Sequence, residues 1–354
     1  LFHFFISFHD MADSHYADKS DKISELEQKN SDTVRRIVGE GAVLLENKGI
    51  LPLPSAGKVA LFGNGARQTI KGGTGSGCVN SRIVINIEKG LEGNGFTVCN
   101  KKWLDDYDSH LKEAKAVYLK EIAEESKRRK TSEANVAMIV PFYEKSVPLI
   151  TEEHLQNTDT DLAIYVIGRI SGEGADRYDK PGDYYLMENE IKNLTLLGQR
   201  FKRLVVLLNI GGVIDIKQLD PIQGIGAILY ICQSGNQIGN ITADLLLGKV
   251  SPSGKLSTTW AENYEDYPCA KEFSYVNGDW NDEYYKEGIY VGYRYFDRFN
   301  IKPRYCFGYG IGYSTFSIEN VNVEADNKNI TVKATVKNTG SKYNGKEVVQ
   351  VYVS

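Results

Sequence analysis

The sequence predicts an α/β fold, a layered α/β sandwich with a mostly parallel sheet, followed by a partial antiparallel β-sandwich. Continuous aliphatic runs at residues 162–166 and 204–210 are typical of strands that are covered on both faces. An amphipathic segment at 186–201 separates them, and strands that alternate with helices favour a parallel sheet. From residue 318 apolar and polar residues alternate, which is typical of antiparallel strands.

The first half of the chain supplies the opening elements of this fold. Apolar residues at helical spacing predict a helix over 21–47, which Gly49 and Pro52 end. Residues 136–148 are more apolar and are expected to return to the core. The strand at 58–62 is expected to be the first of the sheet. The elements predicted after it are a helix at 83–91, a strand at 96–100 and an exposed helix at 104–130 with a solvated basic end at 127–130.

The second half supplies the centre of the sheet, beginning with the strand at 162–166. Gly248 and Pro252 end its last helix. None of its strand-to-helix turns carries the glycine spacing of a dinucleotide-binding fold, so that class is excluded. The elements predicted after the central strand are a helix at 186–201, strands at 204–210 and 227–231, and a helix at 238–247.

Composition excludes several classes of protein. The 354 residues carry a formal net charge of −4, so there is no basic field for nucleic acid, and a neutral or polar small substrate fits better. The cysteines are odd in number at 5, scattered, and without C-x-x-C spacing, which argues against a disulfide framework and a zinc site. A reducing, cytoplasmic location is therefore expected. No stretch reaches the length of a membrane span, so no membrane partner is expected.

The loop that follows the central strand is the candidate site. Ligands of open α/β sheets bind outside the carboxyl ends of the strands. Glu173 stands between Gly172 and Gly174, which leave the backbone free and let a substrate approach closely. The alternative is that Glu173, Asp176 and Arg177 form a solvated ion-pair cluster of little energetic value.

A second loop, KGGTGSGCVN at residues 71–80, is rich in glycine. It matches neither G-x-x-x-x-G-K-[ST] nor G-x-G-x-x-G, and Lys71 precedes the glycines, so no nucleotide site is expected here. A tight loop that exposes backbone N–H groups near a ligand fits the composition.

Five separated motifs resemble the non-barrel part of glycoside hydrolase family 3 β-glucosidases, in the order of that family, from about Val34 to the end of the chain. They are LLENKGILPLP, KGGTGSGCVN, ISGEGADR, EGIYVGYRYFD and FGYGIGYSTF. The resemblance implies that Glu173 is the general acid/base and that the nucleophilic Asp belongs to a separate (β/α)8-type barrel, which this sequence does not contain.

The resemblance also implies roles for neighbouring residues. The glycine-rich loop lies beside the active-site face in this family, which makes Lys71, Thr74 and Ser76 candidates for substrate or interdomain contacts. The alternative for this loop is a turn that packs against the neighbouring domain. Asp176 and Arg177 are candidates for positioning the acid/base loop, and no metal or other cofactor is expected.

The predicted domains follow from these patterns. A leader and N-terminal helix occupy 1–33, the α/β sandwich 34–260 with an insertion at about 104–160, an aromatic-rich connector 261–317, and a truncated fibronectin type III-like domain 318–354. Strands of this last domain are expected at 318–325, 329–338 and 346–354. Met11 is the expected start, and the intact gene is expected to continue past Ser354 into the barrel, as in family members with reversed domain order.

The expected function is that of a fragment of a retaining, exo-acting β-glucosidase. Such enzymes need two carboxyl groups roughly 5 to 5.5 Å apart, of which Glu173 would supply one. The expected partners are a β-glucoside or cello-oligosaccharide and the barrel of the same polypeptide, with a homodimer as a further option. A non-catalytic carbohydrate-binding or assembly module and a β-xylosidase of the same family are the alternatives.

Overall fold

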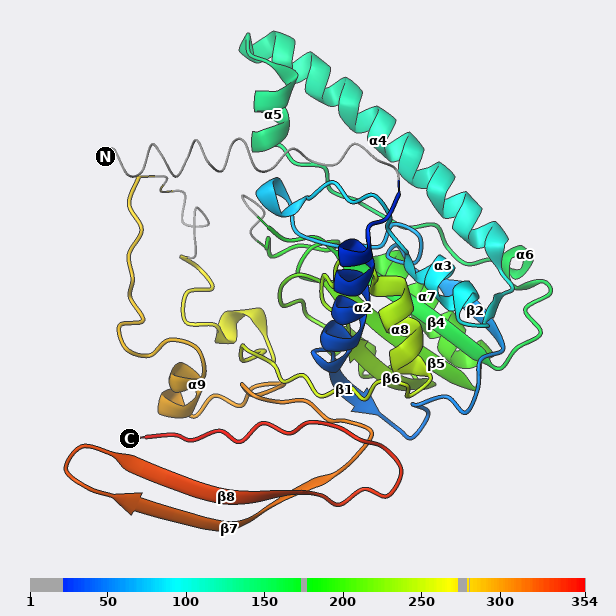
Figure 1. The fold of residues 1–354 in the computed structure, drawn as a ribbon. Helices are drawn as coiled ribbons and strands as arrows, with labels where there is room; N and C mark the ends of the chain where they lie inside the picture. Colours follow the sequence, from blue (N-terminus) through cyan, green and yellow to red (C-terminus); the bar gives the residue numbers. More distant parts are fainter. Residues whose placement is uncertain (1–21, 173–176, 273–278, 280, 354) are drawn as a thin grey trace. The chain divides into compact units, whose positions relative to one another are not determined.

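A mostly parallel six-stranded sheet forms the centre of the protein (Figure 1). The computed structural model describes residues 22–172, 177–272, 279 and 281–353, and the chain divides into two compact units, residues 1–34 and 35–354. The expected leader, residues 1–10 and Met11, lies outside the described residues. Helix α2 (Glu25–Glu40) is the described element that begins in the first unit, and the sheet belongs to the second.

The strand order is β1-β6-β5-β4-β2-β3. Every neighbouring pair is parallel except β1 and β6, which are antiparallel. The strands are β1 (Val43–Asn47), β2 (Lys58–Phe62), β3 (Thr97–Val98), β4 (Leu162–Arg169), β5 (Arg203–Ile210) and β6 (Ile225–Tyr230). The predicted fold class, a layered α/β protein with a mostly parallel sheet, is confirmed.

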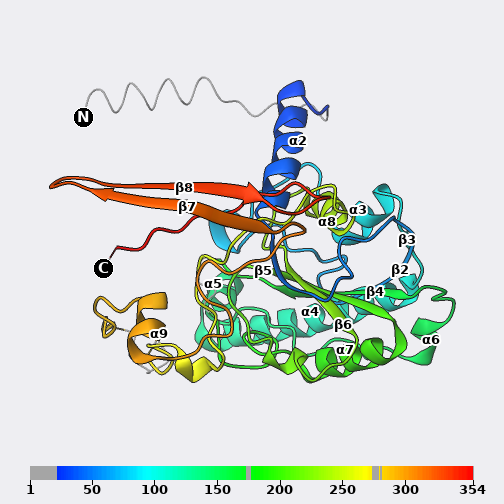
Figure 2. The same ribbon diagram turned by 90° about the horizontal axis from the view of Figure 1, so that it is seen from below.

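Helices cover both faces of this sheet. Figure 2 shows α3 (Ile87–Gly93) and α8 (Ile238–Leu246) on one face, and α4 (Lys101–Arg129) and α7 (Glu188–Arg200) on the other. All eight residues of β4 are buried, as are seven of the eight residues of β5, which is why both read as continuous apolar runs. Among the described residues, no helix is both long enough and apolar enough to cross a membrane.

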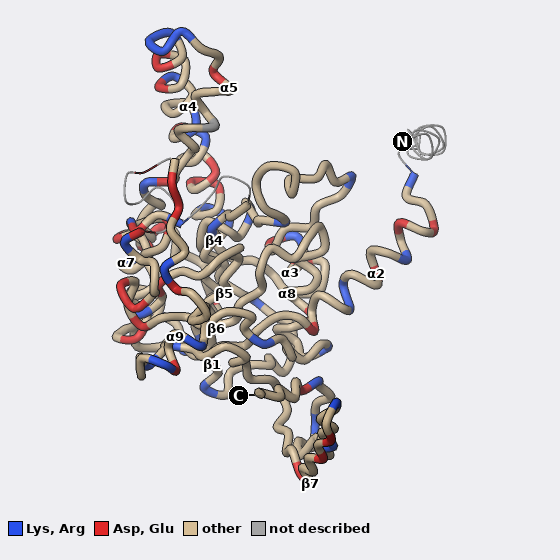
Figure 3. Tube along the Cα trace, turned by 90° about the vertical axis from the view of Figure 1, so that its left-hand side faces the viewer, with Lys and Arg blue, Asp and Glu red and all other residues tan. Residues whose placement is uncertain are grey.

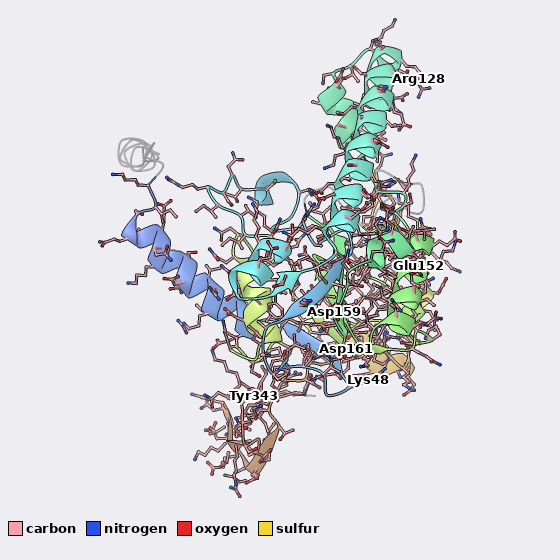
Figure 4. All side chains as sticks on the ribbon, turned by 90° about the vertical axis from the view of Figure 1, so that its right-hand side faces the viewer. Lys48, Arg128, Glu152, Asp159, Asp161 and Tyr343 are labelled. Carbon is pink, nitrogen blue, oxygen red and sulfur yellow. The ribbon has the colours of Figure 1, made fainter. Side chains whose placement is uncertain are left out.

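Helix α4 runs beyond the sheet, with Arg128 near its far end (Figure 4). Basic residues gather at its tip, and acidic residues lie just before them in the helix (Figure 3). Arg128 donates to the carboxylate of Glu125, and Arg129 pairs with the same group. This ion-pair cluster agrees with the predicted solvated helix end. Two shorter helices, α5 (Glu133–Ile139) and α6 (Glu152–Leu155), follow before β4.

Two sequence predictions are wrong at the ends of the α/β layer. The predicted helix over 21–47 ends at Glu40, and Val43–Asn47 form β1 instead. Val43, Leu44 and Leu45 fit either a helix or a strand, and antiparallel pairing with β6 selects the strand. This strand also makes β1, rather than the strand at 58–62, the first of the sheet in the chain.

The C-terminal segment forms one antiparallel hairpin, β7 (Phe316–Ala325) with β8 (Ile330–Asn338). The connector before it contains the short helix α9 (Tyr293–Phe299). The strand predicted at 346–354 does not form over the described residues up to 353. Alternation of apolar and polar residues makes a segment suitable for a sheet, but a strand also needs a partner edge, and this segment has none in the described chain.

Candidate active-site loops at the carboxyl edge of the sheet

The loops that follow β2 and β4 touch each other backbone to backbone. A Cβ atom at Gly73 would lie 2.4 Å from the carbonyl oxygen of Ser171, and one at Gly172 would lie 2.3 Å from the backbone nitrogen of Thr74. Neither distance is sterically possible, so glycine at both positions permits the contact. The two loops that the sequence singled out therefore meet at one place.

The loops after β5 and β6 reach the same place. A Cβ atom at Gly211 would lie 2.1 Å from the hydroxyl oxygen of Ser171 and 2.6 Å from the side-chain amide of Gln233. The Gln233 amide also donates a hydrogen bond of 3.3 Å to the carbonyl oxygen of Ser171. The carboxyl ends of four parallel strands thus converge on Ser171, two residues before Glu173.

Asn209, near the end of β5, ties two of these loops together. Its fully buried side chain accepts from the backbone N–H of Ile70 at 2.7 Å and donates to the carbonyl oxygens of Ile70 and Cys232 at 2.9 and 2.7 Å. Sequence reasoning missed this residue. The available signal was a polar side chain within the apolar run LVVLLNI, because buried amides are almost always hydrogen-bonded.

A second buried asparagine fixes the end of β4. Asn64 accepts from the N–H of Gly168 at 2.7 Å and donates to the Gly168 carbonyl at 3.2 Å and to the Glu144 carboxylate at 3.0 Å. Burial raises the pKa of Glu144, which outweighs the opposing hydrogen bond from Asn64. Sequence reasoning missed both side chains.

The last residue of β4 forms a buried ion pair with α7. The Arg169 guanidinium donates to both carboxylate oxygens of Glu190, at 3.0 and 2.5 Å. Burial opposes the charge of Arg169, but the Glu190 carboxylate outweighs burial, so the pKa of Arg169 is raised. Glu190 also accepts from the N–H of Met187 at 2.8 Å, which caps α7. The strand end that precedes the candidate loop is therefore firmly held.

The structure describes only some of the predicted site residues, and these differ in whether they reach the candidate loop. Glu173 and Asp176 lie outside the described residues. Lys71 donates to the carbonyl of Val79 and, at 2.8 Å, to the hydroxyl of Ser81, so it braces its own loop. Thr74 contacts Gly172, which brings it to the acid/base loop, whereas Ser76 is exposed in the turn Gly75–Gly77.

Arg177 turns back toward the strand rather than out to solvent. Its guanidinium donates to the carbonyl oxygen of Ile170 at 3.1 Å, to that of Arg169 at 3.3 Å and to the Asp183 carboxylate at 2.8 Å. The Arg177 side chain is only 15% exposed, so it is not a solvated group, and its expected role in positioning the loop stays a prediction.

An aromatic cavity of about 540 Å³ adjoins Arg177. Connector residues line much of it, among them Tyr293, whose ring stacks on Phe307 at 5.3 Å, and Phe296, which is buried. The connector thus packs through its aromatic residues. Among the described residues, no group of three or more His, Cys, Asp and Glu side chains is arranged to hold a metal ion.

The class of protein follows from the part of the chain that matches a known family. Residues 42–293 match the glycosyl hydrolase family 3 C-terminal domain, which is more than half of the chain. The chain therefore belongs to glycosyl hydrolase family 3, and the resemblance inferred from its motifs is confirmed.

The particular relatives that it matches are β-glucosidases. It is 37% identical to the beta-glucosidase of Ruminococcus albus over 89% of this chain and 31% of that protein. It is 34% identical to beta-glucosidase A of Butyrivibrio fibrisolvens over 89% of this chain and 40% of that protein. The structure of beta-glucosidase 3B from Thermotoga neapolitana in complex with alpha-D-glucose superimposes with a TM-score of 0.73 at 34% identity, covering 88% of this chain and 42% of that one. The chain thus spans about a third to two fifths of the length of these relatives.

Proposed function

We propose that this chain is the acid/base-bearing part of a retaining, exo-acting β-glucosidase that hydrolyses terminal β-D-glucosyl residues. Glu173 is its general acid/base, and the nucleophilic Asp comes from a barrel domain of the same polypeptide. The substrates are β-glucosides or cello-oligosaccharides. A cytoplasmic location is part of the proposal, because all five cysteines are free thiols in the structure.

One observation carries the proposal. The family motif ISGEGADR follows β4 at the edge where the loops after β2, β5 and β6 also arrive. A carboxylate on a loop between fixed strand ends can be presented to a substrate that lies across the carboxyl edge of the sheet. A relative that matches this chain over 88% of its length binds glucose, which supports a sugar as the ligand.

The chemistry proceeds in two steps. In the first, the carboxylic acid of Glu173 donates its proton to the departing glycosidic oxygen while the barrel carboxylate attacks the anomeric carbon. In the second, the Glu173 carboxylate accepts a proton from water, and the water oxygen displaces the barrel carboxylate from the sugar. Both steps need the two domains together, so the chain without a barrel is expected to have almost no activity.

The test is the Glu173→Gln variant of the polypeptide that contains this chain and its barrel. We expect kcat/KM for methyl β-D-glucoside or cellobiose to fall about 10³-fold, because their leaving groups need protonation. With 2,4-dinitrophenyl β-D-glucoside, whose leaving group needs almost none, kcat/KM should stay within about threefold. Glu188→Gln on the exposed face of α7 is the control, since the Glu188 side chain is 81% exposed.

Undiminished activity of Glu173→Gln on methyl β-D-glucoside would refute the assignment. The coding sequence around this chain separates the remaining alternatives. A frame that encodes no barrel on either side supports a non-catalytic carbohydrate-binding module, and a higher kcat/KM for an aryl β-xyloside than for the aryl β-glucoside supports a β-xylosidase.

A further inference from the structure

The aromatic cavity beside Arg177, which we call the connector cavity, has a volume of about 540 Å³. Sites for small organic molecules measure about 300 to 1,000 Å³ and have mostly apolar walls with a few polar groups. Arg177 and Val213 contribute to one wall, residues 257–259 to a second, and the connector to the rest. The cavity therefore has the size of a binding site for a small organic molecule.

Aromatic rings in the walls of the connector cavity hold one another in place. The ring centroids of Tyr184 and Tyr264 lie 5.0 Å apart, and the two rings meet edge to face. Tyr264 meets Tyr267 in the same way at 6.4 Å, and Tyr267 meets Phe296 at 6.2 Å. The Tyr267 hydroxyl also accepts from the N–H of Ala261 at 3.1 Å, which fixes its ring. Since aromatic pairs favour such edge-to-face arrangements, the walls keep their shape without a ligand.

Thr259 contributes a buried hydroxyl group to the cavity lining. The residue is only 6% exposed, and its Oγ1 atom has no hydrogen-bond partner among the described residues. The next residue fixes the backbone, because the Trp260 N–H donates to the carbonyl oxygen of Tyr305 at 2.9 Å. Buried polar atoms are almost always hydrogen-bonded in proteins, so an unpartnered hydroxyl in a cavity wall indicates a ligand with a polar atom.

The charges around the cavity favour a neutral ligand. Arg177 is the one cation among the described residues that line it, and its guanidinium already donates to the Asp183 carboxylate at 2.8 Å. Its Nε atom is buried without a partner and offers one further N–H. Glu287 adds a negative charge to the lining. An anion would therefore leave water without gaining an uncompensated positive charge.

We propose that the connector cavity binds a neutral aromatic alcohol with one ring or two fused rings, such as a phenol or a naphthol. The rings of the ligand lie against the aromatic walls, and its hydroxyl group forms a hydrogen bond with Thr259. A sugar fits less well, because it carries a hydroxyl on nearly every carbon and aromatic walls leave most of these unpaired. The inference goes beyond the proposed function and requires no role of Glu173.

The experiment titrates 2-naphthol, followed by its own fluorescence, with the intact polypeptide that contains this chain. Saturating glucose is present throughout, so that a sugar site in that polypeptide is occupied. We expect a dissociation constant below about 100 μM, which is within the ligand efficiency of a molecule of this size. The anion 2-naphthoate has the same rings and should bind at least about tenfold more weakly.

Two tryptophan substitutions in the connector test where 2-naphthol binds. Val291 lines the cavity and is 57% exposed, so a larger side chain there can fill the cavity without disturbing the core. Ile289, two residues earlier, is 74% exposed and is not part of the lining, which makes it the matched control. Val291→Trp should weaken binding at least about tenfold and Ile289→Trp less than about twofold, because only the first indole competes with the ligand for space.

Thr259→Val tests the hydrogen bond, because valine replaces the hydroxyl with a methyl group of similar shape. We expect 2-naphthol to bind about fivefold more weakly, whereas the affinity for naphthalene, which has no hydroxyl, should change less than about twofold. The Tm of the free protein should not fall, because the hydroxyl that is removed had no partner. A lower Tm would show that this hydroxyl already bonds within the protein.

The proposal is wrong if 2-naphthol does not bind, if 2-naphthoate binds equally well, or if Val291→Trp behaves like Ile289→Trp. Equal losses of 2-naphthol and naphthalene affinity in Thr259→Val would contradict the hydrogen bond with Thr259. None of these measurements depends on glucoside hydrolysis. Failure of this inference is therefore distinct from failure of the proposed function, which the Glu173→Gln variant tests.

Discussion

Single polar side chains within apolar surroundings decide how the strand ends are arranged. Asn64 and Asn209 use both ends of their amide groups to bind backbone groups of neighbouring loops. Removing either side-chain amide would leave buried backbone groups without a hydrogen bond. Each such unsatisfied group costs about 1 to 3 kcal/mol. Glu144, which accepts from Asn64, adds a titratable group to this buried network.

Glu144 should make stability depend on pH. Burial raises its pKa, so the folded protein holds this proton more tightly than the unfolded chain. Its stabilising contribution is present below the unfolded pKa of about 4.3 and is lost as pH rises through the higher folded pKa. From pH 4 to pH 8 the free energy of unfolding of the natural protein should therefore fall relative to that of Glu144→Gln, as measured by urea unfolding. Glu152→Gln at an exposed position of α6 is the control (Figure 4), and a constant difference between the natural protein and Glu144→Gln would contradict the prediction.

At the scale of elements, two helices meet through glycine. A Cβ atom at Gly90 of α3 would lie 2.0 Å from the backbone of Gly239 in α8, and one at Gly239 would lie 1.9 Å from the carbonyl oxygen of Asn86. The backbones of α3 and α8 are therefore in direct contact on one face of the sheet (Figure 2). No side chain of any size fits between them.

Alanine substitutions in α3 should have opposite effects at two positions. Gly90→Ala should destabilise the protein by about 3 kcal/mol, because the added methyl group meets backbone that cannot move away. Gly93→Ala in the same helix should be neutral or stabilise it by up to about 1 kcal/mol, because nothing lies within 4 Å of the added atom and alanine favours the helix. Urea unfolding measures both, and similar stability of the two variants would refute this account of the helix contact.

For the whole molecule, burial differs sharply between the α/β layer and the C-terminal hairpin. β4 is buried throughout, whereas every residue of β7 is exposed or half-buried. Apolar residues of the hairpin remain exposed, Val323 by 60% and Ile330 by 55%, so folding of the hairpin removes little apolar surface from water. Local stability should follow this contrast.

Hydrogen exchange should reveal this difference in local stability between the sheet and the hairpin. Amides of β5 should exchange only through global unfolding, and those of β7 and β8 through local opening, so the β5 amides should be slower by on the order of 10³-fold. Mass spectrometry of peptides from both regions at neutral pH measures the ratio. Comparable protection of β5 and β7 would show that the hairpin shares the stability of the sheet.

Much of the fold could be predicted from local pattern. The strands β2, β4, β5 and β6 and the helices α4, α7 and α8 lie close to where apolar runs, apolar periodicity and composition predicted them. The strand Val43–Asn47 could not be predicted as a strand, because its apolar residues also suit a helix and only pairing with β6, far along the chain, decides between them. The strand predicted at 346–354 could not be ruled out from the sequence for the same reason. Alternation of apolar and polar residues does not supply a partner strand, and the described residues of this segment form none.

The sequence by itself placed Glu173 between two glycines after a buried strand, which is a local feature, and the resemblance of its motifs to the family implied the acid/base role. It also placed Arg177 in that loop, but without its partners. Only the tertiary structure decided that Arg177 reaches back to Arg169, Ile170 and Asp183, and that Asn209 joins the loops after β2 and β6. The Asn209 contacts depend on parallel strands whose carboxyl ends meet in space although they are far apart in the chain, and no short stretch of sequence encodes that meeting.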